Sequence, residues 1–149
     1  MAISAQVINT IQQKLSLSIQ NTTAVSGGSI NHAWCILTAK GKYFVKINNT
    51  YQFPGMFQAE ARGLTLIRAT GAIAVPKVIL EGTAGEDSFL VLEWIDARRP
   101  TAKASEVLGI SLAHMHKNTA AHFGLDHDNY MGSLRQSNKI HPRWSVFFY

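Results

Sequence analysis

Hydrophobic positions along this chain recur first with a helical period and then with the alternation of β-strands. Over residues 4–15 apolar side chains return every three or four positions, which predicts an amphipathic helix with Ser4 as its N-cap. Three β-like runs follow, at residues 22–25, 32–38 and 43–47, and polar turns join them. This order predicts a helix followed by an antiparallel meander.

The pattern then changes, and one helix is inserted before the sheet continues. Pro54 is tolerated in a first helical turn and Gly71 favours a helix end, so the two bound a predicted helix. A five-stranded antiparallel sheet with a helix after its third strand is an α+β fold. The predicted elements of this part are a helix at 54–68, strands at 75–80 and 88–94, an irregular stretch at 95–100 and a helix at 101–117.

Composition indicates a globular protein with a weak preference for anions. The chain has 149 residues, of which 46% are hydrophobic and 15% charged, and its net charge is +5. The basic residues are scattered singly apart from Arg98 and Arg99, so the charge favours phosphate over a nucleic acid or a membrane surface. A nucleic-acid module would instead show steeply salt-dependent binding.

The N-terminus, the apolar runs and the single cysteine indicate the cellular compartment. The N-terminus has no basic region and no long apolar stretch, so no signal peptide is predicted, and no apolar run is long enough for a membrane span. We therefore expect a cytoplasmic protein. The single cysteine, Cys35, excludes an intramolecular disulfide framework, and its apolar neighbours favour a buried, inert thiol over a reactive one.

A short polar loop between the first two predicted strands could bind phosphate. Gly27 and Gly28 let the backbone approach a polyphosphate closely, and Ser29 and Asn31 add side-chain donors. The loop is neither a Walker P-loop nor a full Gly-x-Gly-x-x-Gly motif. Taken alone, it is as compatible with a simple hairpin turn.

Lys46 and Glu60 strengthen the phosphate interpretation. Lys46 lies in the middle of the third strand, and Glu60 falls within the apolar stripe of the next helix, where a carboxylate needs a partner. Lys46 is the natural partner, although it could also lie on an exposed face and Glu60 could pair with another basic residue. Glycine loop, strand lysine and helix glutamate in this order are typical of the phosphate-binding half of a kinase.

Other candidate chemistry is limited. Glu93, Trp94 and Ile95 stand where the fifth predicted strand ends and the irregular stretch begins. A kinase presents backbone groups to adenine at this place, although the segment could be merely a strand end. The histidines show no zinc-ligand spacing, and there is no Gly-x-Ser-x-Gly motif of a hydrolase. The sequence also contains no His-x-Asp catalytic loop, so we assign no catalytic residue and no metal ligand within this chain.

Several separate motifs resemble the fructosamine kinase family, in order and over essentially the whole chain. This family belongs to the protein-kinase-like phosphotransferases, beside the aminoglycoside and choline kinases. The motifs are residues 26–31, 43–48, 57–64, 75–76, 89–93, 108–116, 123–124, 128–132 and the Trp-x-x-Phe-Phe ending at 144–148.

The resemblance implies an ATP- and Mg²⁺-dependent kinase that phosphorylates the sugar of ketosamines and so promotes protein deglycation. MgATP and a glycated amine or glycated protein are then the partners, without nucleic acid or membrane. Lys46 and Glu60 become the phosphate-positioning ion pair, residues 27–31 the phosphate loop and residues 93–95 the adenine hinge. Residues 1–95 would form the nucleotide-binding N-lobe, and residues 96–149 a linker and the start of a helical C-lobe.

Two departures from the family pattern modify this expectation. The family's His-Gly-Asp-Leu-Trp and Asp-Pro-Ala regions, which carry the catalytic base and the metal-binding aspartate, do not occur in this chain, which has roughly half the usual length. We therefore expect the chain alone to be inactive, with the Mg²⁺ ligands in the missing C-lobe. Many eukaryotic relatives also carry a cysteine in the phosphate loop where Ser29 stands here, so redox control is not carried over.

Two alternatives stay open beside the ketosamine kinase. One is a non-catalytic module that binds a nucleotide or a partner protein, and the other is a related kinase that acts on an aminoglycoside or choline. The chain also ends on large aromatic rings that we expect to be buried against something, and that would favour self-association if they were exposed. These are Trp144, Phe147, Phe148 and Tyr149.

Overall fold

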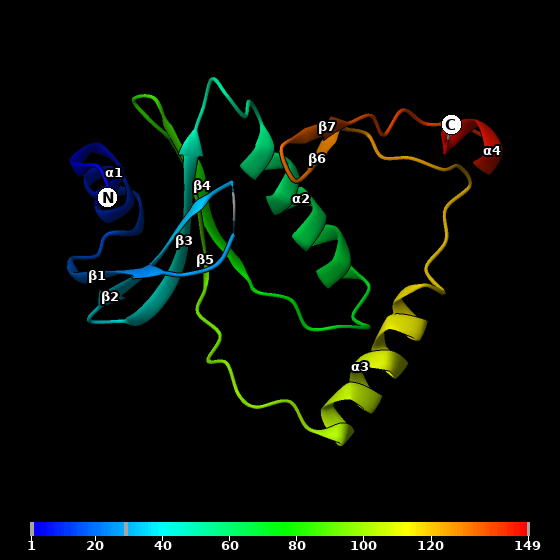
Figure 1. Ribbon diagram of the computed structural model, residues 1–149, viewed down its shortest axis with the longest axis horizontal. Helices are drawn as coiled ribbons and strands as arrows, with labels where there is room; N and C mark the ends of the chain where they lie inside the picture. The colour runs from blue at the N-terminus through cyan, green and yellow to red at the C-terminus, as the bar shows by residue number, and fades with distance from the viewer. Residues whose placement is uncertain (1, 29, 149) are drawn as a thin grey trace.

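The computed structural model describes residues 2–28 and 30–148 and confirms the α+β fold (Figure 1). A five-stranded antiparallel sheet stands between two helices, α1 and α2, and the later elements extend away from it. The elements are α1 (Ala5–Leu15), β1 (Ile19–Val25), β2 (His32–Thr38), β3 (Gly41–Asn49), α2 (Met56–Ala69), β4 (Val78–Ala84), β5 (Asp87–Glu93), α3 (Ala102–Met115), β6 (Asn129–Met131), β7 (Leu134–Gln136) and α4 (Trp144–Phe147).

The order of the strands puts β3 at the centre of the sheet. The strands lie in the order β1-β2-β3-β5-β4, because the connection through α2 places β4 at the edge and β5 beside β3. In the antiparallel register, Lys46 of β3 pairs with Ala33 on one side and Leu90 on the other. Hydrogen bonding to partners on both sides fixes the backbone of a central strand, so the Cα atom of Lys46 is held in place.

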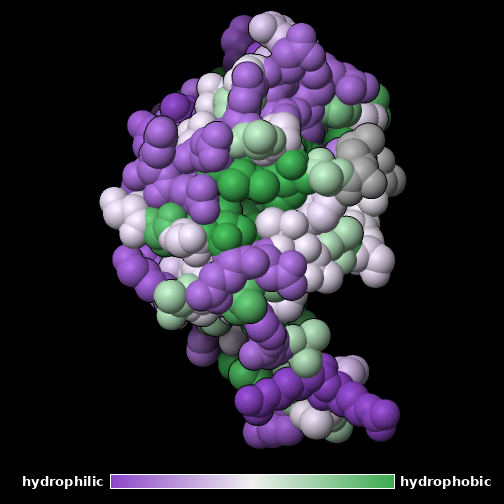
Figure 2. All heavy atoms as spheres, turned by 90° about the vertical axis from the view of Figure 1, so that its left-hand side faces the viewer, coloured by the Kyte–Doolittle hydropathy of each residue, from purple (hydrophilic) through white to green (hydrophobic). Residues whose placement is uncertain are grey.

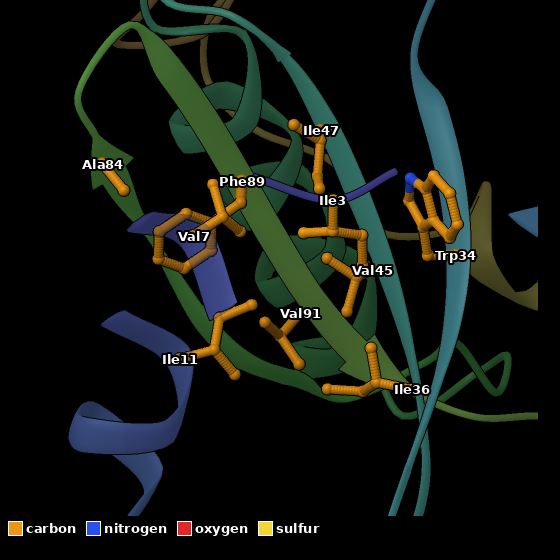
Figure 3. Packing of buried hydrophobic residues seen from close by; sticks show 10 residues of the cluster. All are labelled: Ile3, Val7, Ile11, Trp34, Ile36, Val45, Ile47, Ala84, Phe89 and Val91. Atoms are coloured by element: carbon orange, nitrogen blue, oxygen red, sulfur yellow. The ribbon is translucent and has the colours of Figure 1, made fainter. Parts of the chain in front are cut away.

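Alternation along β3 divides the hydrophobic core into two parts. Val45 and Ile47 point toward α1, where they pack with Val7 and Ile11 of that helix (Figure 3). Phe44 points toward α2 and packs against the cluster that contains Phe57. Successive side chains of a strand point to opposite faces. Lys46 therefore shares the α2 face with Phe44.

Side chains cap the N-termini of α1 and α3, and the cap of α1 is the predicted Ser4. The Ser4 side chain accepts a hydrogen bond from the backbone N–H of Val7, and the Thr101 side chain accepts one from Ala104. Each cap satisfies a backbone donor that the first turn leaves without a partner. The predicted helices at 4–15 and 101–117 are thus confirmed, with small differences at their ends.

Three predicted boundaries around α2 and β4 are wrong in detail. Pro54 does not open α2, because the helix begins at Met56 after Gly55, whose φ of 74° breaks the helical backbone. The fourth strand begins at Val78 instead of residue 75, since Pro76 has no N–H to donate to a ladder. The fourth strand also ends later than the predicted residue 80, because β4 continues to Ala84 and the reversal is made at Gly85 and Glu86.

Much of the chain after β5 extends away from the main sheet, although Tyr130 of β6 packs against the cluster that contains Phe57. Helix α3 buries none of its residues, and it forms the narrow lower part of the molecule in Figure 2. Figure 2 also shows hydrophobic residues exposed in a band between hydrophilic ones on the face of the main body. The division into an N-lobe of residues 1–95 and a second part of residues 96–149 stays a prediction.

The C-terminal aromatic rings pack on one another. Trp144 stacks on Phe148 at a centroid distance of 5.1 Å and contacts Phe147 at 5.8 Å and Phe123 at 5.6 Å. Trp144 and Phe148 are still 53% and 69% exposed, so the expectation that these rings are buried is not met within the described residues. Tyr149 lies outside the described residues. Self-association through these rings stays a prediction.

Candidate functional site

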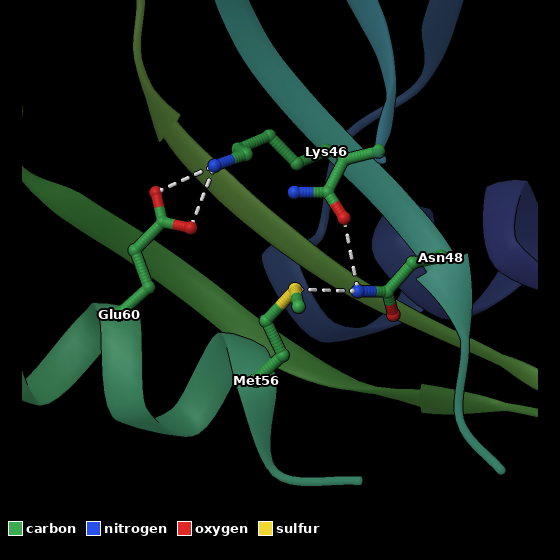
Figure 4. A network of polar contacts seen from close by, with 5 residues as sticks. Lys46, Asn48, Met56 and Glu60 are labelled. Atoms are coloured by element: carbon green, nitrogen blue, oxygen red, sulfur yellow. Dashed lines mark hydrogen bonds and ion pairs between the residues drawn. The ribbon is translucent and has the colours of Figure 1, made fainter. Parts of the chain in front are cut away.

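An ion pair between β3 and α2 is the central feature of the candidate site (Figure 4). The Nζ atom of Lys46 lies 2.6 Å from Oε2 and 2.9 Å from Oε1 of Glu60, so it donates to both carboxylate oxygens. The two side chains are 23% and 30% exposed. The pairing predicted from the sequence is therefore present in the structure.

The position of this pair suits ligand binding better than it suits stability. Ion pairs that retain this much solvent contact stabilise a fold by about 1 kcal/mol or less. The ammonium also lies 5.9 Å from the centroid of the Phe57 ring, beneath the first turns of α2. The pair thus fixes a cation at the edge of the second core cluster, where an incoming anion can reach it.

The glycine loop reaches the same region through Asn31. Gly27 and Gly28 have φ values of 117° and 93°, which side chains rarely tolerate. A Cβ atom at Gly27 would meet no heavy atom within 4 Å, so the backbone angle and not crowding makes glycine necessary. This open space leaves room for a group to approach the loop. Ser29, the remaining loop residue predicted to bind phosphate, lies outside the described residues.

Asn31, Lys46 and Glu60 line one cavity of about 410 Å³. Its other walls come from the inner face of α2 and from the β6–β7 hairpin, which contributes Asn129 and Tyr130. The Tyr130 hydroxyl donates to the carbonyl oxygen of Pro54 at 2.8 Å, which ties the hairpin to the start of α2. The structure therefore brings Asn31 together with Lys46 and Glu60, whereas Gly27 and Gly28 line a neighbouring cavity of about 230 Å³ that Asn31 also lines. The hairpin adds a wall that the sequence analysis did not predict.

The hairpin was missed because its strands are short. Each strand of β6 and β7 has three residues, too few for a period of two to stand out. One local signal was present, since Gly132 and Ser133 stand between them and Gly132 has a φ of 64°. A glycine at such a two-residue connection is typical of a hairpin turn.

The predicted adenine segment lies at the end of β5, beside a second cavity. The Trp94 ring lies 6.3 Å from that of Phe44 and 5.8 Å from Lys42 Nζ, and it lines a cavity of about 500 Å³ with Thr23 and Cys35. Cys35 is half-buried and lines this cavity, so the prediction of a fully buried thiol is wrong. Cys35 shares a face with Phe44 because the two residues pair directly across β2 and β3.

The three predicted hinge residues differ in their surroundings. Glu93 already donates its backbone N–H to the carbonyl oxygen of Lys77 at 2.9 Å, and its side chain accepts from the Lys77 N–H at 3.1 Å. Trp94 is half-buried, and Ile95 is 59% exposed. The backbone donors available for a base would therefore be those of Trp94 and Ile95.

A separate cavity lies on the outer side of α2. It has a volume of about 720 Å³, and Arg62, Leu66, Asp126 and His127 are among its lining residues. Nδ1 of His127 lies 2.5 Å from Oδ1 of Asp126, and this hydrogen bond lowers the pKa of the exposed Asp126 carboxyl. None of the predicted site residues lines this cavity.

The described residues offer neither a cluster of metal ligands nor a helix that could span a membrane. These residues contain no group of three or more His, Cys, Asp or Glu side chains placed to hold a metal ion. None of the helices in this part of the chain is both long and apolar enough to span a membrane.

Relatives with known sequences match nearly the whole chain. A probable ketoamine kinase from Synechocystis is 39% identical over 98% of this chain and 49% of its own length. A probable ketoamine kinase from Vibrio vulnificus is 34% identical over 99% of this chain and 51% of its own length. The chain therefore spans about half the length of the curated relatives it matches.

Solved structures are similar over the same range. A crystal structure described as that of a candidate fructosamine-3-kinase from Haemophilus somnus has a TM-score of 0.86 and 27% identity, over 96% of this chain and 49% of the other. Spectinomycin phosphotransferase, in complex with ADP and spectinomycin, has a TM-score of 0.61 and 18% identity over 80% of this chain and 40% of its own, which shows a shared fold. The sheet with its inserted helix is thus similar to the kinase-like N-lobes of such enzymes.

A family model agrees with these matches. The model of the fructosamine kinase family covers residues 1–149. Coverage of the full chain, together with relatives that are more than 30% identical over nearly all of it, shows that the chain belongs to the fructosamine kinase family.

Proposed function

We propose that this chain is the nucleotide-binding half of an ATP-dependent kinase that phosphorylates the sugar of a glycated amine. The observation that carries the proposal is the contact of Lys46 Nζ with both oxygens of Glu60, next to the end of the glycine loop. Kinases use such a pair to hold a cation at the phosphates of a nucleotide. Family membership and the fold shared with a phosphotransferase solved with ADP support the same proposal.

The residues present fit the phosphates of a nucleoside triphosphate, while the ligands of its Mg²⁺ are expected outside this chain. Bound MgATP would supply the transferable phosphoryl group and the charge of the metal. The backbone at Gly27 and Gly28 is open toward solvent, and it would lie against the phosphates with the side chains of Asn31 and Lys46. Glu60 would hold the ammonium of Lys46 in place before the nucleotide arrives. For Ser29 the same role rests on the sequence alone.

The adenine base would occupy the cavity beside Trp94. An aromatic ring gives the planar base a surface to stack against, and the backbone N–H groups at Trp94 and Ile95 are placed at the rim of the sheet. Glu93 would contribute less than predicted, because its N–H is already donated to Lys77. Within this proposal Glu93 stabilises the end of β5 while its two successors contact the base.

We further propose that these 149 residues alone do not transfer phosphate. Phosphoryl transfer needs a group that positions the acceptor hydroxyl and ligands that hold the metal. The sequence contains no His-x-Asp triplet, and the described residues contain no cluster of metal-binding side chains. The same facts support one alternative, a module that binds a nucleotide without catalysis. A cytoplasmic location also stays a prediction.

Calorimetric titration of the chain with MgATP tests the nucleotide proposal directly. Saturable binding supports it, whereas the absence of measurable heat, together with no thermal stabilisation by MgATP, would refute it. For the acceptor, residues 1–149 can be joined to the second half of a ketoamine kinase relative. Phosphorylation of a fructosamine by this chimera, in preference to an aminoglycoside or choline, supports the proposed substrate class.

Cys35 provides a probe of the adenine cavity. We expect MgATP to slow alkylation of the Cys35 thiol by iodoacetamide, because the base would cover the cavity that the thiol lines. At about ten times the Kd, the rate should fall about tenfold, in proportion to the fraction of free protein. Mass spectrometry of the labelled chain measures this rate.

The control for this measurement is the Lys46→Met variant at the same MgATP concentration. It keeps the thiol and the cavity but loses the cation that is expected to hold the phosphates, so with an affinity about 10- to 100-fold weaker the protection should fall to about twofold or less. Equal alkylation rates with and without MgATP, in a wild-type chain that binds MgATP, would place the base elsewhere.

A further inference from the structure

Asn48 is a buried polar residue beside the proposed phosphate site. It follows Lys46 by two positions on the central strand β3, so the two side chains share the face toward α2. Asn48 is only 4% exposed. A buried amide costs free energy unless its donors and acceptor are satisfied. The hydrogen-bond partners of the Asn48 side chain must therefore compensate the cost of burying it.

The side chain of Asn48 joins three segments, and its contact with Met56 is drawn in Figure 4. Its Nδ2 atom donates to Oδ1 of Asn31 at 3.0 Å and to Sδ of Met56 at 3.2 Å. Its Oδ1 atom accepts a hydrogen bond from Oγ of Ser88 on β5. Asn48 thus connects the end of the glycine loop, the first residue of α2 and the neighbouring central strand.

The contact with Asn31 anchors the end of the glycine loop, next to Ile30, which packs against the second core cluster. Ser26, Gly27 and Gly28 are exposed, and glycine adds conformational freedom that binding must remove. A fixed point at Asn31, immediately before β2, shortens the free part of the loop. The anchor comes from the strand that carries Lys46, so loop and cation are held by one support.

The same contact also orients the Asn31 amide. Oδ1 of Asn31 accepts from Asn48, which leaves Nδ2 as the other polar atom of that side chain. Among the described residues this Nδ2 makes no hydrogen bond, and Asn31 lines the cavity with Lys46. Phosphate oxygens accept hydrogen bonds and never donate them when fully ionised, so an amide must present its NH₂ group to them.

The contact with Met56 extends the connection to Glu60. Met56 is the first residue of α2, and Glu60 follows four positions later, one helical turn along the same side. A shift of the Asn48 side chain would therefore displace both Asn31 in the loop and the first turn of α2, the helix that carries Glu60.

We infer that Asn48 is a positioning residue, which orients Asn31 toward the nucleotide phosphates and couples the glycine loop to the Lys46–Glu60 pair. The inference rests on the proposed nucleotide-binding function and extends it to a residue that does not itself touch the nucleotide. Asn48 acts through Asn31 and Met56. The inference predicts that Asn31 contributes to nucleotide binding only while its side chain is hydrogen-bonded to Asn48.

A double-mutant cycle on the chain, with the fluorescent nucleotide TNP-ATP and Mg²⁺ as the probe, tests this coupling. Asn48→Leu, which keeps the side-chain size and removes the hydrogen bonds, should weaken binding about tenfold. Asn31→Ala should weaken it by a similar factor. The double variant should be no weaker than the weaker of the two single variants, because each removes the same interaction.

Thr38→Val is the matched control for a general loss of stability. Thr38 is the last residue of β2 and is 3% exposed, and its hydroxyl donates to the carbonyl oxygen of Gly41. Gly41 begins β3, so this contact lies at the end of β3 that is far from Asn48. This variant should lower stability without changing the Kd for TNP-ATP. Multiplied losses in the double variant, or an equal loss of affinity in Thr38→Val, would show that Asn48 only supports the sheet.

Amide hydrogen exchange without nucleotide separates this inference from the proposed function. Residues 26–31 should exchange faster in Asn48→Leu than in the wild type, and at the wild-type rate in Thr38→Val. If the wild type fails to bind TNP-ATP, the proposed function fails and the phosphate role of Asn31 with it. If the wild type binds and Asn48→Leu changes neither affinity nor exchange, only the inference about Asn48 is overturned.

Discussion

Lys46→Met is expected to weaken binding of MgATP by about 10- to 100-fold while the fold remains almost as stable as the wild type. A hydrogen bond to a charged group contributes about 1.5–3 kcal/mol, and each 1.4 kcal/mol corresponds to about a factor of ten in Kd. Methionine retains the length of the lysine stem but not its charge. Isothermal titration calorimetry gives the Kd, and urea denaturation gives the free energy of unfolding.

The loss of stability should be about 1 kcal/mol or less, because Lys46 and Glu60 keep 23% and 30% of their side-chain exposure. Lys40→Met serves as the control, since Lys40 is an exposed lysine in the turn between β2 and β3 and lies outside the site. It should bind MgATP as the wild type does. A large loss of stability in Lys46→Met, with unchanged affinity in the variant that remains folded, would show that Lys46 is structural.

Phe57→Ala is expected to lower the free energy of unfolding by about 3–5 kcal/mol. Phe57 is fully buried on α2 and is central to the cluster with Met56, Leu90 and Leu92. Truncating such a ring removes its burial energy and leaves a cavity that the rigid sheet cannot close. Urea denaturation followed by circular dichroism measures the change, with an unchanged slope confirming that the folded state is still compact.

Leu66→Ala on the same helix is the matched control. Leu66 is 55% exposed, so its truncation should cost less than 1 kcal/mol. Phe57 also lies beneath the ammonium of Lys46, so its loss should weaken MgATP binding in the fraction that remains folded. Equal stability losses in the two variants would contradict the burial pattern of α2.

The sequence predicted the main elements well where one strong periodic signal dominated. The helix at 4–15 and the strand at 32–38 agree with α1 and β2 almost to the residue, because caps and polar turns mark their ends. Boundaries near Pro54 and Pro76 were less accurate. Near proline the helical and extended tendencies compete, and tertiary packing decides where the element begins.

The candidate site was predictable to a similar degree. A lysine in an apolar strand and a carboxylate in an apolar helical stripe are costly when separated, so their pairing followed from the sequence. The half-buried position of Cys35 did not follow, because an apolar run of residues does not tell which of its two faces meets the core. That choice depended on the order of strands in the sheet and on which face α2 covers.

Sequence alone determined the α+β class, the order of the elements from α1 to α3 and the pairing of Lys46 with Glu60, since these depend on local periodicity and on the cost of burying charge. Tertiary structure alone decided that Asn48 anchors Asn31, that Cys35 and Trp94 share a cavity, and that the β6–β7 hairpin closes the site next to α2. These contacts join segments far apart in the chain. Their geometry is fixed only when the sheet assembles, because no local pattern encodes which distant residues will meet.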